Sequence, residues 1–110
     1  MAKRIFITGI GIISAIGKDA SEALESIKKA HSGVEKIQHL KTIHKGKIPL
    51  CEVKYSNAEL AQMAYEGTTT KASRTTLLGV IAAKEAWRSA GSPSLGDGKT
   101  GVFSGNTVGG

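Results

Sequence analysis

A short glycine-rich turn near the N-terminus has the composition of a nucleotide-binding site. Gly9-Ile10-Gly11-Ile12-Ile13-Ser14 follows an apolar run, and a strand that opens through G-x-G-x-x-G into a helix holds pyrophosphate on backbone amides. Here Ser14 replaces the third glycine, the apolar run continues through Ile16, and no acidic residue ending a second strand follows about twenty residues later. The glycines suit a strand against which another backbone packs closely. We therefore predict no nucleotide and no other cofactor.

Cysteine and histidine could supply a nucleophile, a general base or a metal site. Cys51 is the only cysteine. It follows Leu50 in a strand-like segment, where no helix N-terminus activates the thiol and no base is adjacent in the sequence. His31, His39 and His44 have irregular spacings with Cys51 that match no zinc pattern. We predict that Cys51 is a small half-buried hydrophobic residue, and that these residues form no catalytic or metal site.

The charge balance points to an acidic partner. Fifteen Lys and Arg against nine Asp and Glu give a formal net charge of +6, which favours nucleic acid, an anionic surface or an acidic carrier protein. Four of the lysines lie between Val34 and Pro49, where aromatic residues for base stacking are missing. We interpret residues 34–49 as an irregular basic loop with a solvated face, and we predict no nucleic-acid binding.

The elements that must position these residues begin with residues 4–17. Six isoleucines and one phenylalanine in this stretch show no alternation of polar and apolar positions, a pattern typical of a strand covered on both faces. We predict the central strand of a parallel sheet. Asp19-Ala20-Ser21-Glu22 then has the form of a capping box, so an amphipathic helix should begin there, lie on the sheet and end at Ser32-Gly33.

A short strand and a short helix are expected in the middle of the chain. Residues 48–55 have some strand character, and Pro49 places them at an edge or at the start of a strand. Asn57 should cap a helix over residues 58–65, which Gly67 ends.

The longest helix is predicted over residues 72–90. From Leu77 to Ala83 it is apolar all the way round, so it should be buried on more than one side, with Lys84, Glu85 and Arg88 on its outer face. Residues 100–104 should form a second core strand parallel to the first. The predicted order is therefore β-α-loop-β-α-α-β.

Length and composition set the broad class. At 110 residues the chain is one domain at most. One cysteine allows no internal disulfide, the N-terminus does not have the form of a signal peptide, and no apolar run approaches the roughly 18 to 20 residues of a membrane span. We predict a soluble, cytoplasmic protein with no membrane insertion.

Four stretches of the chain carry a resemblance to a known family. They are residues 5–17, His31-Ser32-Gly33-Val34, residues 78–91 and residues 101–110. In that order they resemble the opening strand, the K-S-G-I, the A-A-x-x-A-x-x-x-A-G helix and the G-V-x-x-G-x-x-x-G-G strand and turn of the β-ketoacyl-ACP synthases, which have the thiolase fold. The matches span nearly the whole chain, so together they are specific.

This resemblance implies that residues 1–110 are the N-terminal fragment of a β-ketoacyl synthase domain, similar to 3-oxoacyl-ACP synthase II. The implied fold is α/β, the N-terminal and incomplete part of a thiolase-like fold (β-α-loop-β-α-α-β). The parent protein would catalyse decarboxylative condensation of malonyl-ACP with an acyl thioester, in fatty-acid or related polyketide or aryl polyene synthesis. The family's nucleophilic cysteine and two histidines have no counterpart here, so the fragment alone should be inactive. The resemblance further implies acyl carrier protein as a partner and a homodimeric parent.

Two kinds of site residue also follow from the resemblance. Lys71 matches a position used for carrier docking near the start of the long helix, and Arg74 is its neighbour. Val108, before the paired glycines, matches a position beside the acyl pocket that helps to set chain length. Two alternatives stay open: a chain-length-factor-like partner that lacks the cysteine, and a non-catalytic interaction module.

Overall fold

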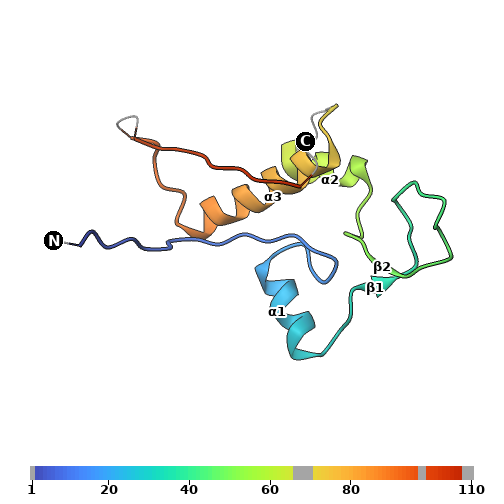
Figure 1. Ribbon diagram of the computed structural model, residues 1–110. Helices are drawn as coiled ribbons and strands as arrows, with labels where there is room; N and C mark the ends of the chain where they lie inside the picture. The colour runs from blue at the N-terminus through green and yellow to red at the C-terminus, as the bar shows by residue number, and fades with distance from the viewer. Residues whose placement is uncertain (1, 66–70, 97–98, 108–110) are drawn as a thin grey trace.

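Three helices and one small antiparallel sheet make up the described part of the chain. The computed structural model describes residues 2–65, 71–96 and 99–107. In chain order the elements are α1 (Ala20–Lys28), β1 (Val34–Glu35), β2 (Leu50–Cys51), α2 (Asn57–Tyr65) and α3 (Arg74–Ser89), as Figure 1 shows. All three predicted helices are present, whereas the sheet differs from the predicted one.

Helix α1 begins where the sequence predicted. Asp19 accepts a hydrogen bond from the amide of Glu22 at 2.8 Å, and the Glu22 carboxylate accepts one from the amide of Lys18 at 2.9 Å. The capping box is therefore confirmed, although its return bond goes to the residue before the cap. Leu24 and Ile27 on the apolar stripe are 51% and 66% exposed. The described residues thus cover only part of the stripe that was predicted to lie on a sheet.

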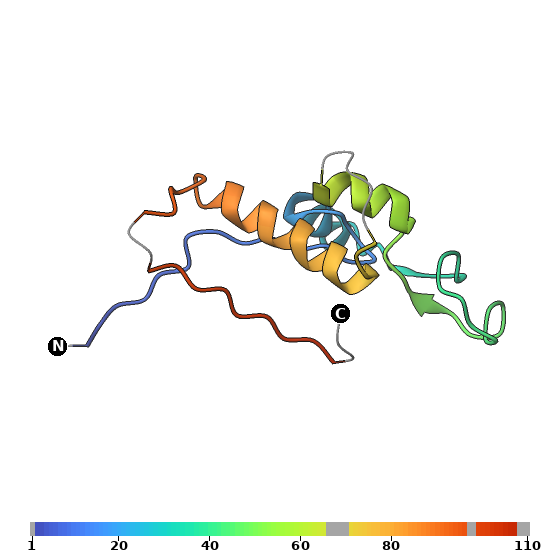
Figure 2. The same cartoon turned by 90° about the horizontal axis from the view of Figure 1, so that it is seen from above.

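Helices α2 and α3 pack side by side and form the core (Figures 1 and 2). Leu60 and Ala64 of α2 and Leu77 of α3 are almost fully buried. Burial of one leucine side chain stabilises a fold by about 1.5–3 kcal/mol, so these few contacts contribute strongly to the stability of a small domain. The predicted burial of residues 77–83 on more than one side is met only in part, because Leu77 is buried while Gly79 and Ala83 are exposed.

Ser56, rather than the predicted Asn57, caps α2. Its hydroxyl oxygen accepts a hydrogen bond from the amide of Glu59 at 3.3 Å. The Glu59 carboxylate in turn accepts bonds from the amide and the hydroxyl of Ser56, at 2.7 Å each. These contacts form a capping box one residue earlier than expected. Asn57 is the first residue of the helix, and its side-chain oxygen accepts a hydrogen bond from Arg74 instead.

The small sheet pairs β1 with β2 in antiparallel fashion, with Val34 opposite Cys51 and Glu35 opposite Leu50. The interpretation of residues 34–49 as wholly irregular is therefore wrong at their start. The strand character predicted over residues 48–55 is limited to the two residues after Pro49, which has no N–H group to donate to a neighbouring strand.

The two core strands predicted over residues 4–17 and 100–104 do not form within the described part of the chain. Both segments are extended (Figure 2), but apart from an isolated bridge between Ser14 and Gly17 neither pairs with a strand. Ile5 is 93% exposed and Phe103 is 100% exposed. A strand needs a neighbour for its N–H and C=O groups, and the described residues provide none beside either segment. The predicted β-α-loop-β-α-α-β order is observed as α1-β1-β2-α2-α3.

Candidate functional site

The N-terminal segment lies against α3 through its glycines. A Cβ atom on Gly9 would lie 2.7 Å from the amide nitrogen of Ala90, and one on Gly11 would lie 2.7 Å from that of Ala86. Because glycine has no Cβ, it alone allows two backbones to approach so closely. The prediction that these glycines serve close packing is confirmed. They face the side of a helix, not the helix N-terminus that a pyrophosphate site requires.

Glu85 fastens this segment and the start of α1 to α3. Its two carboxylate oxygens accept hydrogen bonds of 2.8 Å each from the amides of Ile12 and Ala20. The prediction that Glu85 lies on the outer face of the long helix is therefore wrong. A carboxylate is tolerated on this packed face because each of its oxygens accepts a hydrogen bond from a backbone N–H group. Glu85 thus fixes the turn between the N-terminal segment and α1.

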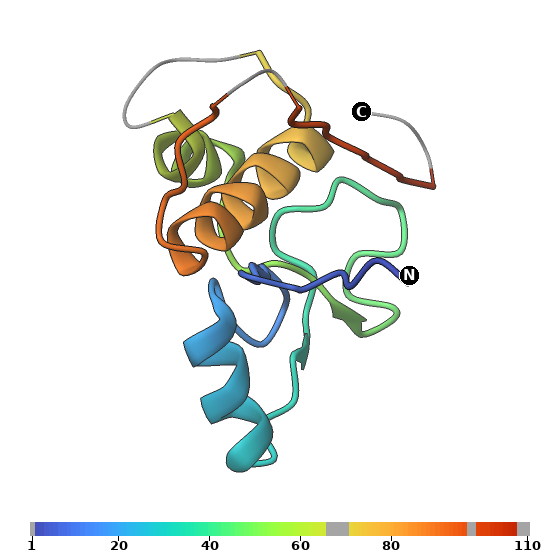
Figure 3. The ribbon, with the colours of Figure 1, turned by 90° about the vertical axis from the view of Figure 1, so that its left-hand side faces the viewer.

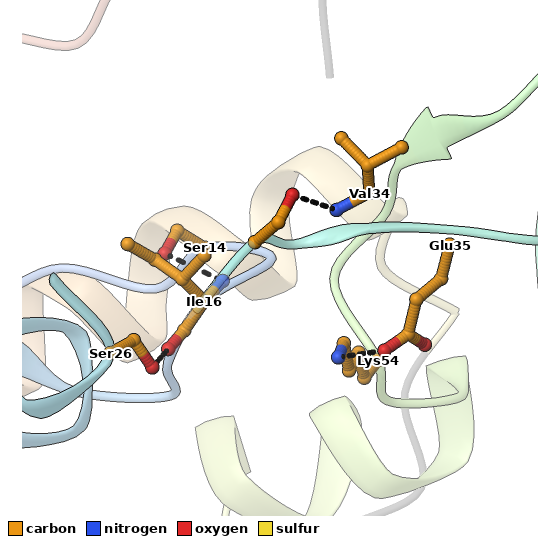
Figure 4. Close-up of polar contacts among 7 residues, drawn as sticks. Ser14, Ile16, Ser26, Val34, Glu35 and Lys54 are labelled. Atoms are coloured by element: carbon orange, nitrogen blue, oxygen red, sulfur yellow. Dashed lines mark hydrogen bonds and ion pairs between the residues drawn. The ribbon is translucent and has the colours of Figure 1, made fainter. Parts of the chain in front are cut away.

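A small cavity of about 120 Å³ lies at this turn. The Ser14 hydroxyl accepts a hydrogen bond from the amide of Ile16 at 3.3 Å, and the Ser26 hydroxyl donates one to the carbonyl of Ile16 at 2.6 Å (Figure 4). Lys54 also lines the cavity, and its ammonium group pairs with Glu35 at 2.5 Å. These polar groups hold the protein together, and the volume is below the roughly 300 Å³ at which ligand pockets begin. We assign the cavity a structural role.

Arg74 and Lys71, the two predicted docking residues, have different surroundings. The Arg74 guanidinium donates to the carbonyls of Val53 and Tyr55 at 2.7 and 2.8 Å and to the side-chain oxygen of Asn57 at 2.9 Å. It therefore joins the first turn of α3 to the segment that links β2 with α2. Lys71, three residues earlier, is exposed. Docking at either residue stays a prediction.

An apolar hollow of about 300 Å³ lies beside Arg74. Its lining comes from the small sheet, from the loop before β2 and from α3, and consists of Ile37, Leu40, Leu50, Cys51, Glu52, Val53, Arg74 and Leu78. Cys51 is exposed, and the prediction that it is half-buried is wrong because a two-stranded sheet leaves both of its strands at an edge. Within the described residues no three His, Cys, Asp or Glu side chains are grouped to hold a metal.

Glu52 organises the loop between the two strands. Its carboxylate accepts hydrogen bonds from the amides of Gln38, His39 and Leu40, at 2.7, 3.0 and 2.6 Å. Burial acts to raise the pKa of Glu52, but these three amides and the nearby His39 lower it by more, so the net pKa lies below the usual value. No local sequence pattern marks this role, because the bonded amides lie 12 to 14 residues away.

Some of the predicted features lie outside the described residues. Val108, the predicted acyl-pocket residue, is one of them, and Gly67, the predicted end of the short helix, is another. Among the residues that the structure describes, no helix combines the length and the apolar character needed to cross a membrane.

An extended apolar segment lies against α3, beside two further helices and a small sheet. The family model for "Beta-ketoacyl synthase, N-terminal domain" matches residues 2–110. The chain therefore belongs to the β-ketoacyl synthase family. No curated protein and no solved structure matches the chain.

Family membership confirms two predictions from the sequence. The predicted family is correct, and the mixed helices and small sheet are those of an incomplete α/β, thiolase-like N-terminal domain. The family is one of condensing enzymes, which are transferases of fatty-acid-type synthesis and typically act with acyl carrier protein. The match to the family model does not identify which residues catalyse the reaction.

Proposed function

We propose that a longer protein containing this chain is a 3-oxoacyl-[acyl-carrier-protein] synthase. It catalyses the decarboxylative condensation of malonyl-ACP with an acyl thioester, in fatty-acid synthesis or in the related synthesis of polyketides or aryl polyenes. The observation that carries this proposal is the match of the family model to residues 2–110. A cytoplasmic homodimer is the proposed working form.

The charge of the chain supports acyl carrier protein as the partner. The formal net charge is +6, and Lys71 is exposed just before α3. Exposed cations raise the rate at which an acidic partner is met and help to orient it. Lys71 is therefore the proposed docking residue, and Arg74 would support it by holding the start of α3 in place.

The condensation needs groups that these 110 residues do not supply. A cysteine thiolate must accept the acyl group and release the carrier thiol, and the enolate left when malonyl-ACP loses CO₂ then attacks that acyl group. Cys51 is the only cysteine, and it lies on β2 rather than at a helix N-terminus. We propose that the 110-residue chain alone is inactive. Within a longer protein it forms part of the fold and provides contacts with acyl carrier protein.

Two proteins test this proposal: the 110-residue chain and a longer protein that contains it. Each is incubated with acyl-ACP and malonyl-ACP, and the 3-oxoacyl-ACP and CO₂ formed are measured. We expect condensation by the longer protein only. Turnover by the chain alone would contradict its inactivity. A longer protein that binds acyl-ACP without becoming acylated would favour the chain-length-factor-like alternative, and one that does not bind acyl-ACP would favour a non-catalytic module.

A further inference from the structure

The loop between β1 and β2 carries a concentration of positive charge. We call residues 36–48 the basic loop, and Figure 3 shows it as the wide teal-to-green loop that connects β1 and β2. Its lysines are all exposed, and they are Lys36, Lys41, Lys45 and Lys47. The loop thus supplies four of the fifteen basic residues of the chain.

Carboxylates do not neutralise this charge in the described part of the chain. The ion pairs there are Lys18 with Glu22, Lys28 and Lys29 with Glu25, and Lys54 with Glu35. None of them involves a lysine of the basic loop. The two carboxylates that flank the loop are already engaged, since Glu35 pairs with Lys54 and Glu52 binds three loop amides. The basic loop therefore presents a positive surface to solvent.

Ordered turns give the basic loop a defined conformation. The amides of Lys45 and Lys47 donate to the carbonyls of Thr42 and His44 at 3.3 and 2.9 Å. Gly46 has a φ of +79°, which glycine adopts without strain. With Glu52 holding the base of the loop, the lysines are carried on a preformed backbone. A preformed surface loses less conformational entropy on binding than a flexible one.

Apolar side chains accompany the lysines. Leu40, Ile43 and Ile48 are 51%, 82% and 45% exposed. An apolar centre within a charged rim is typical of a protein–protein interface. The basic loop contains no Phe, Tyr or Trp, so it lacks the side chains on which single-stranded nucleic acids usually stack. These features favour an acidic protein surface over RNA or DNA.

The basic loop is also continuous with the start of α3. Ile37 and Leu40 of the loop line the same apolar hollow as Arg74 and Leu78 of α3. Figures 2 and 3 show the loop and the beginning of that helix on the same side of the molecule. A partner that meets Lys71 could therefore extend across the hollow to the loop.

We propose that the basic loop, together with the start of α3, binds an acidic protein surface with carboxylates around a short apolar strip. This inference rests on the proposed function, under which acyl carrier protein is that partner. The lysines meet its carboxylates at the rim, and Leu40 and Ile43 meet the apolar strip at the centre.

The inference is tested by measuring how the unchanged protein and its variants bind fluorescently labelled acyl-ACP. Binding is followed by fluorescence anisotropy at low and at high ionic strength. The loop variant carries Lys41→Glu and Lys47→Glu, and the control variant carries Lys28→Glu and Lys29→Glu, so both have the same net charge. At low salt we expect binding to weaken at least about tenfold in the loop variant and less than about twofold in the control. Ile43→Ser should weaken binding to a similar degree at both salt concentrations, because its contact is apolar.

Each of the following results would overturn the inference. Equal weakening in the loop and control variants would mean that net charge alone attracts the carrier. The protein could also bind a single-stranded RNA oligonucleotide more tightly than acyl-ACP. If the loop variant lost that RNA binding, nucleic acid would be the partner. Equal binding of acyl-ACP by the unchanged protein and by the loop variant would refute this inference alone. A longer protein that contains the chain and does not bind acyl-ACP would refute the proposed function as well. If circular dichroism shows that the loop variant is unfolded, Lys41→Gln with Lys47→Gln takes its place.

Discussion

Replacement of Glu85 by alanine should release the N-terminal segment from α3. The carboxylate accepts one hydrogen bond from Ile12 and one from Ala20, which lie 73 and 65 positions before Glu85 in the chain. A hydrogen bond to a charged group contributes about 1.5–3 kcal/mol. Both sites are partly open to water, which can replace the lost acceptor, so we expect about 2–3 kcal/mol for the pair. Glu85→Gln should cost about half as much, because its amide oxygen still accepts one bond.

Native-state hydrogen exchange at the amides of Ile12 and Ala20 measures this loss directly. A decrease of about 2 kcal/mol in the free energy of local opening makes exchange about 30-fold faster. The control is Glu25→Ala on α1, where the removed ion pairs are exposed and contribute about 0.2–1 kcal/mol. Exchange at Ile12 that changes equally in Glu85→Ala and Glu25→Ala would refute the role assigned to Glu85.

Three further predictions concern Glu52, the start of α3 and Val108. The pKa of Glu52 is lowered from its usual 4.5, so the stability it contributes is fully present above that pH and is lost as the pH falls through the lowered value. Glu52→Gln should therefore give an unfolding midpoint that depends less on pH below about 4.5, and an unchanged pH profile would contradict this. Lys71→Glu should weaken acyl-ACP binding at low salt without changing the unfolding midpoint, whereas Arg74→Ala should lower the free energy of unfolding by about 1–3 kcal/mol because it removes three hydrogen bonds. In a longer protein that contains the chain, Val108→Phe should cost about 1–3 kcal/mol in acylation, more for long acyl groups than for short ones, and an equal loss for both lengths would make Val108 a packing residue.

Features whose partners lie within a few residues could be predicted from the sequence. The capping box of α1 is one example, because Asp19 and Glu22 bond to amides three and four positions away. The long helix is another, since its apolar pattern and the following Gly91 are local signals. The family also followed from short stretches in the correct order.

Features whose partners lie far along the chain could not be predicted. The periodicity of the long helix gives Glu85 the appearance of a surface residue, and only the folded chain brings two distant amides to it. The isoleucine-rich run of residues 4–17 has the composition of a strand. A strand forms only where another segment pairs with it, and the composition of the run does not show whether such a segment is present. The contacts of Arg74 are of the same kind, because the carbonyls that its guanidinium binds lie 19 and 21 residues earlier in the chain.

The glycine contact with α3 also sets the register of the N-terminal segment along the helix. Two residues of an extended chain advance by about 6.6 Å, and four residues of a helix advance by about 6.0 Å. The spacing of Gly9 and Gly11 therefore matches the spacing of the small residues on α3 that they contact. These residues are Ala82, Ala86 and Ala90.

Steric clashes prevent the N-terminal segment from shifting along α3 in either direction. A shift of one residue would press Ile10 against the helix backbone, and a shift of two would do the same with Ile7 or Ile13. The register of the segment is thus set by steric fit, without a ladder of hydrogen bonds. As a consequence, the contact with α3 fixes the register of residues 9–12, and any strand that pairs with this part of the chain must adopt that register.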